Sequence, residues 1–74
     1  MIKYKFYNNV HQGVTPEEVV EDMRRMAYTP YDSNEEYMKA VQRRVLIYNN
    51  NLIRVKDESE FLSELVRVNV LEKV

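Results

Sequence analysis

The sequence contains no cysteine and only one glycine, Gly13, among its 74 residues. The absence of cysteine excludes a disulfide framework, a thiolate metal cluster and a thiol nucleophile. With one glycine the chain has no glycine-rich phosphate loop, and with two prolines it has no flexible linker. The motifs HExxH, CxxC and GxSxG are also absent. We therefore expect no enzymatic activity, no cofactor and no metal ion.

Long apolar runs and an excess of one charge sign are also missing. No run approaches the roughly 18 apolar residues of a membrane span, and the first residues alternate instead of forming a signal-peptide block. These features predict a cytoplasmic protein without membrane contact. The net charge of −1 gives the whole molecule no attraction for nucleic acid. A hydrophobic content of 45% and a charged content of 31% are typical of one globular domain, residues 1–74.

What the chain does contain is a set of three helix start signals. Each is a capping residue followed three positions later by glutamate: Thr15 with Glu18, Ser33 with Glu36, and Asp57 with Glu60. This spacing lets the first side chain accept a hydrogen bond from the first turn while the glutamate reaches back to the cap. We therefore expect three helices, of which the first ends near Ala27 and the second near Leu46.

The remaining segments indicate strands and turns. Alternation at residues 2–6 predicts a half-buried strand, and residues 8–13 indicate a turn with a solvated His11, in which Gly13 is free to adopt positive φ. Residues 52–55 are β-prone and predict a short strand, with a small hairpin as the alternative. Asn69 is a left-handed helix stop before a terminal strand at residues 70–74. The prediction is an α+β domain, a small sheet covered by three helices in the order β-α-α-β-α-β.

The apolar positions of these elements predict one shared core. Its expected members are Ile2, Tyr4, Phe6, Val20, Met23, Val41, Val45, Phe61, Leu62 and Leu65.

Two surface features are candidate binding sites. Tyr28 and Tyr31 flank the bend at Pro30, and exposed tyrosines are favoured at protein interfaces, so we predict that they bind a partner protein. Lys39, Arg43 and Arg44 form the sharpest basic feature and are the alternative, a nucleic-acid-binding face on the second helix.

The layout of several segments resembles small uncharacterised accessory proteins of phages and prophages of Gram-positive bacteria. These segments include Gly-Val-Thr-Pro-Glu-Glu, Glu-Glu-Tyr-Met-Lys-Ala-Val-Gln-Arg-Arg-Val and Glu-Phe-Leu-Ser-Glu-Leu. The resemblance covers most of the chain. It implies a mobile-element protein that binds a host protein, such as a component of antiviral defence, and blocks or redirects it.

Two functional hypotheses follow. The first is a small non-enzymatic module that binds a host protein as a modulator or inhibitor. The second is a nucleic-acid-binding regulator. Because strands near both ends of the chain leave sheet edges unpaired, we also expect a homodimer.

Overall fold

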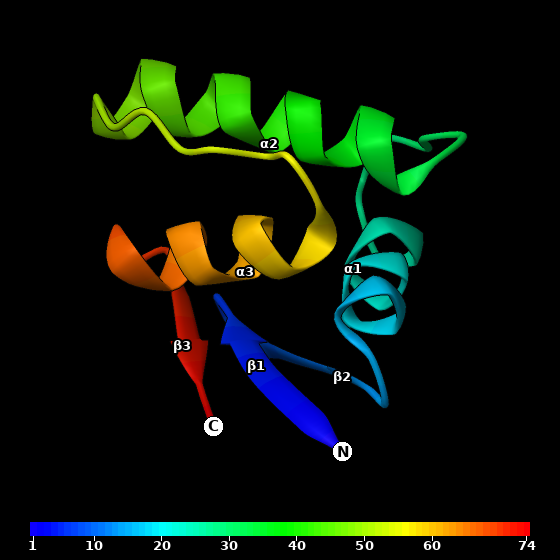
Figure 1. Cartoon of the computed structure of the whole chain (residues 1–74). Coiled ribbons are helices and arrows are strands. Elements are labelled where there is room, and N and C mark those ends of the chain that lie inside the picture. The colour runs from blue at the N-terminus through cyan, green and yellow to red at the C-terminus, as the bar shows by residue number, and fades with distance from the viewer.

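The computed structural model describes all 74 residues and contains three strands and three helices (Figure 1). In chain order they are β1 (Ile2–Phe6), β2 (Asn9–Gly13), α1 (Pro16–Arg25), α2 (Asn34–Asn49), α3 (Glu58–Arg67) and β3 (Leu71–Lys73). The predicted α+β class is confirmed. The order is β-β-α-α-α-β, so the predicted order is wrong in two places, one before the first helix and one before the third.

All three helices begin where the sequence signals place them. The side chains of Thr15, Ser33 and Asp57 each accept a hydrogen bond from the amide of the glutamate three residues on. The reciprocal bond differs from the expected one in every case. Each glutamate carboxylate accepts from the residue before the cap, at 2.9 to 3.1 Å: Glu18 from Val14, Glu36 from Asp32, and Glu60 from Lys56. The cap bonds satisfy first-turn amides that the helices themselves leave free, whereas the glutamate carboxylates hold the residue that leads into each helix.

The sheet is antiparallel with strand order β2-β1-β3, so β1 lies in the centre. The predicted turn at residues 8–13 is wrong, because residues 9–13 form β2 and only Tyr7 and Asn8 form the turn. His11 is not solvated, since alternation along β2 buries it against α1. Gly13 does not have positive φ. A Cβ there would lie 2.6 Å from the Cβ of Glu18 and 2.9 Å from the amide nitrogen of Val19, so close packing on α1 demands glycine.

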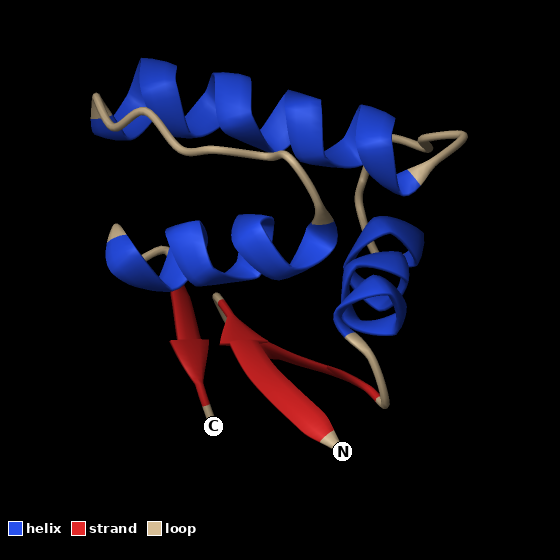
Figure 2. Cartoon of the chain, viewed as in Figure 1, coloured by secondary structure: helices blue, strands red, loops and turns tan.

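Residues 51–55, which we call the strap, are extended but belong to no strand. The predicted strand at residues 52–55 and its hairpin alternative are therefore wrong. Figures 1 and 2 show the reason: α2 and α3 run in the same direction, and the strap returns between them. A neighbouring helix offers no backbone ladder to a strand. The β-prone Ile53 is nevertheless fully buried, so its apolar side chain is used for packing.

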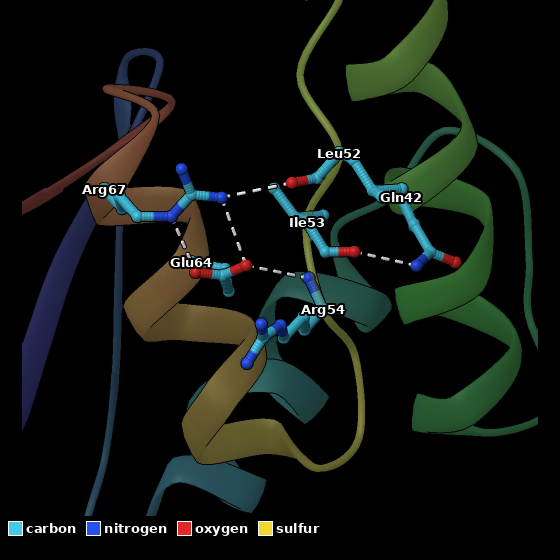
Figure 3. Close-up of polar contacts among 6 residues, drawn as sticks. All are labelled: Gln42, Leu52, Ile53, Arg54, Glu64 and Arg67. Atoms are coloured by element: carbon cyan, nitrogen blue, oxygen red, sulfur yellow. Dashed lines mark hydrogen bonds and ion pairs between the residues drawn. The ribbon is translucent and has the colours of Figure 1, made fainter.

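Side chains replace the missing strand partner of the strap (Figure 3). Three hydrogen bonds hold its backbone: Gln42 Nε2 donates to the Ile53 carbonyl at 2.8 Å, Arg67 Nη2 donates to the Leu52 carbonyl at 3.1 Å, and the Arg54 amide donates to Glu64 Oε1 at 2.9 Å. The hydrogen bonds from Arg67 and from the Arg54 amide lower the pKa of Glu64. The strap is thus fixed to α2 on one side and to α3 on the other.

The core lies where α3 is enclosed by α1, α2 and the sheet. Seven predicted core residues are buried there: Val20, Met23, Val41, Val45, Phe61, Leu62 and Leu65. Ile2, Tyr4 and Phe6 of β1 are half-buried and pack against this cluster, which confirms the predicted core. The cluster also contains Val19, Tyr37, Met38, Ile53 and Leu71. None of the helices combines the length and the apolar character needed to cross a bilayer.

The helix starts are joined by Asn34, the first residue of α2. Its side-chain Nδ2 donates to the Glu17 carbonyl of α1 and to the Glu58 carboxylate of α3. Its side-chain Oδ1 accepts from Arg24 Nε at 3.0 Å. Arg24 also donates to the carbonyl of Tyr31 at 3.0 Å. These bonds fix the bend between α1 and α2.

Candidate binding groove

The two tyrosines predicted at the bend have different environments. Tyr28 is fully exposed. Tyr31 is half-buried, and its ring meets that of Tyr37 edge-on with the centroids 5.5 Å apart. The Tyr31 hydroxyl also accepts a hydrogen bond from Arg44 Nη2 at 2.9 Å. Tyr31 is therefore part of the packed structure, and the structure does not bring it together with Tyr28 as a pair of free side chains.

The three basic residues of α2 also separate. Lys39 forms an ion pair with Glu35 at 2.9 Å. Lys39 and Arg43 both line a hollow on the side of α2 that faces the strap. Arg44 lies about 100° further around the helix and turns to the opposite side. The structure thus places Lys39 and Arg43 together and Arg44 apart from them.

Arg44 lines a groove that the sequence did not reveal. We call it the aromatic groove, and eight residues line it: Phe6, Tyr7, Val41, Arg44, Val45, Tyr48, Asn49 and Val70. It has a volume of about 240 Å³ and opens between the β1–β2 turn, α2 and the segment before β3. A second hollow of about 400 Å³ shares Tyr7, Asn49 and Val70 with it, so the concave surface continues toward β3.

The helix α2 is longer than predicted, and its additional residues carry Tyr48 to the groove. The helix does not end near Leu46 but continues to Asn49, and Asn50 then adopts the left-handed conformation at φ 55°. The additional turn carries Tyr48 as an 81% exposed side chain. A polar residue that tolerates positive φ supplies the stop, which is why the end falls at the asparagines.

Tyr7 is the second exposed aromatic side chain of the groove, with 76% of its surface accessible. It occupies the first position of the two-residue turn between β1 and β2, where its φ is 55°. Glycine, asparagine and aspartate favour such positions, and a bulky side chain is strained there. The Phe6 ring packs on the Tyr7 ring at 4.6 Å between centroids. Strained non-glycine residues concentrate at functional sites, so this position marks the groove as a candidate site.

The electrostatics of the groove are set by one cation and no carboxylate. Arg44 is the only charged residue in its lining. Burial raises the pKa of the core residue Tyr37 to about 12, and the nearby Arg44 guanidinium acts on it in the opposite direction. Tyr37 therefore stays neutral at physiological pH, and the positive charge of Arg44 is not offset within the groove.

No arrangement typical of catalysis or metal binding accompanies the groove. The one histidine, His11, is buried and bonds through Nδ1 to an Asp22 oxygen at 2.9 Å, where it joins β2 to α1. No group of three or more histidine or carboxylate side chains is placed to hold a metal ion.

Comparison of the chain with protein-family models, with curated proteins and with solved structures found no match.

Proposed function

We propose that this protein is a small, non-enzymatic module that binds another protein through the aromatic groove. The observation that carries the proposal is the juxtaposition of Tyr7, Arg44 and Tyr48 around a concave apolar surface. Tyrosine and arginine are enriched among the residues that dominate binding energy at protein interfaces. Each of the two tyrosine side chains combines a large apolar ring with a polar hydroxyl group. Both are exposed, whereas other aromatic side chains of the protein are buried in the core.

The lining of the groove suggests the chemistry of the partner. Phe6, Val45 and Val70 form an apolar floor that suits an aliphatic or aromatic side chain. Arg44 provides a planar, bidentate donor, and no carboxylate in the lining competes for it. The partner is therefore a protein that presents an apolar side chain next to an acidic one. The Phe6 ring packs on the Tyr7 ring at 4.6 Å between centroids and restrains it before binding, which reduces the entropy lost on association.

The resemblance to phage accessory proteins supports a more specific form of this proposal. In that form the partner is a host protein, and occupying its surface modulates or inhibits it. Nucleic-acid binding by Lys39, Arg43 and Arg44 has less support, because Arg44 is turned away from the other two and Lys39 is paired with Glu35. The bend at Tyr28 is the other possible location of a protein contact.

The proposal is tested by mapping the contact surface. The partner is isolated from host lysate by affinity purification. It is then titrated into isotopically labelled protein, and the amide resonances of the labelled protein are followed by NMR. We expect the largest changes at Tyr7, Asn8, Tyr48 and Val70. Changes confined to residues 28–32 would place the site at the bend instead. Recovery of nucleic acid alone, with binding that weakens steeply with salt, would support the alternative function.

A further inference from the structure

A second surface, on the opposite side of α2, combines exposed aliphatic side chains with a local excess of positive charge. We call it the cationic surface, and it consists of Lys39, Arg43, Leu46, Leu52, Arg54 and Arg67. Two hollows of about 370 and 490 Å³ lie on either side of Leu52, one toward α2 and one toward α3. Figure 3 shows the part of this surface where the strap lies between the two helices.

The charge of this surface differs from that of the whole molecule. The two hollows are lined by four cationic side chains and by a single carboxylate, that of Glu64. Glu64 is already engaged by Arg67 at 2.7 Å and by the Arg54 amide at 2.9 Å. Lys39 is paired at 2.9 Å with Glu35, which lies outside the two hollows, so the positive charge that no carboxylate offsets is that of Arg43 and Arg54. The protein as a whole has a net charge of −1, so this excess of positive charge is local. A face of one charge sign attracts a partner of the opposite sign.

The centre of the surface is apolar and exposed. Leu52 is 68% exposed and Leu46 is 46% exposed, and both line the hollow toward α2. Leu52 cannot be buried by its own chain, because the backbone bonds that hold the strap direct Ile53, its neighbour, into the core. Alternation along the extended strap therefore turns Leu52 outward.

From these observations we propose that the cationic surface binds an acidic amphipathic helix of a partner protein. The apolar side chains of that helix pack on Leu46 and Leu52 in the hollow toward α2, and its carboxylates lie next to Arg43 and Arg54. The surface carries no aromatic side chain on which a base of single-stranded nucleic acid would stack. Recognition of an anionic bilayer typically uses a cluster of about four to eight basic residues. On this surface only Arg43 and Arg54 are outside ion pairs. This inference does not rest on the aromatic groove, which faces the other side of α2.

The experiment uses a synthetic helix of about 18 residues, a length at which an isolated helix is stable enough to study. The peptide carries leucine at every third or fourth position, glutamate beside the leucines and alanine at the remaining positions, because glutamate at every non-leucine position would unfold the helix by charge repulsion. It bears a fluorophore for anisotropy titration. Anionic phosphatidylserine vesicles and a single-stranded oligonucleotide are titrated in parallel. We expect binding of the peptide that weakens as salt is added, and much weaker binding of the other two probes.

Matched variants test whether the contact is the one proposed. Arg43→Glu should weaken peptide binding by roughly fivefold to tenfold, whereas Lys3→Glu, the same charge change on β1, should have about a twofold effect or less. Leu52→Asp should abolish measurable binding while leaving the melting temperature close to that of the parent, since the side chain is mostly exposed. Equal losses for Arg43→Glu and Lys3→Glu, an unaffected Leu52→Asp variant, or preferential binding of vesicles or oligonucleotide would overturn the proposal.

Discussion

Single residues carry the two features on which the proposed binding function rests. Tyr7 occupies a left-handed backbone position that a smaller residue would adopt more easily, and Tyr48 occupies an added helical turn with most of its side chain exposed. Neither placement is explained by packing, since both side chains lie largely outside the core. Both therefore favour a role in recognition over a role in stability.

Tyr7→Gly is expected to stabilise the fold. Glycine adopts positive φ without the penalty of about 1–2 kcal/mol that an L-residue has there. Part of this gain is offset by the greater entropy of glycine in the unfolded chain, so the net rise should be about 0.5–1 kcal/mol, a few degrees in melting temperature. Tyr28→Gly is the control, because Tyr28 is exposed without positive φ and its replacement should lower stability slightly. Equal decreases in both variants would show that Tyr7 is not strained.

Tyr37 is expected to make stability depend on pH in the alkaline range. Burial raises its pKa to about 12, while the same phenol in the unfolded chain titrates near 10. Its contribution is therefore fully present below pH 10 and is lost as the pH rises toward 12, by about 2–3 kcal/mol.

Denaturant melts of the parent and of Tyr37→Phe across this range isolate that contribution, because the other titrating groups are common to both proteins. The stability difference between the two should change between pH 10 and 12 and stay constant below. A difference independent of pH would mean that the Tyr37 phenol is not buried in its neutral form.

At the scale of elements, the strap shows how an extended segment is held without a sheet. Its backbone bonds go to side chains of two helices, and its buried Ile53 anchors it to the core. This arrangement also creates the cationic surface, because the strap brings Leu52 and Arg54 between the basic side chains of α2 and α3.

Gln42→Ala should destabilise the protein by about 1–3 kcal/mol, because the carbonyl of the buried Ile53 then loses its partner. Arg43→Ala, at the neighbouring and exposed position, should stay within about 0.5 kcal/mol of the parent. Thermal or chemical denaturation measures both. A Gln42→Ala variant as stable as Arg43→Ala would mean that water replaces the lost hydrogen bond or that the strap is held by Ile53 alone.

The same elements explain what the sequence could and could not predict. Helix starts were predictable because a cap and its glutamate interact within one turn. The second strand was not, because its buried positions are His11 and Gly13 while Val10 points outward. The strap has strand propensity but no neighbouring strand, which is a property of the tertiary fold. The groove was missed because its aromatic residues come from segments far apart in the chain.

At the scale of the whole molecule, the expectation of a homodimer stays a prediction. The outer backbone edges of β2 and β3 have no strand partner within the chain, and pairing of two copies would satisfy one of them. Light scattering should give about twice the mass of one chain, 8.9 kDa, at high micromolar concentration. A mass of one chain at that concentration would exclude the dimer under those conditions.

The molecule presents two faces of different chemistry on opposite sides of α2, and the aromatic groove is the one to which we assign its principal binding. Affinity for the purified partner, measured by calorimetry with two single-tyrosine variants, tests this assignment most directly. Tyr48→Ala should weaken binding by about 2 kcal/mol or more, roughly thirtyfold in Kd, with little change in melting temperature. Tyr28→Ala, which replaces a still more exposed tyrosine outside the groove, should leave Kd within about twofold of the parent. A large loss for Tyr28→Ala together with an unchanged Kd for Tyr48→Ala would contradict the account.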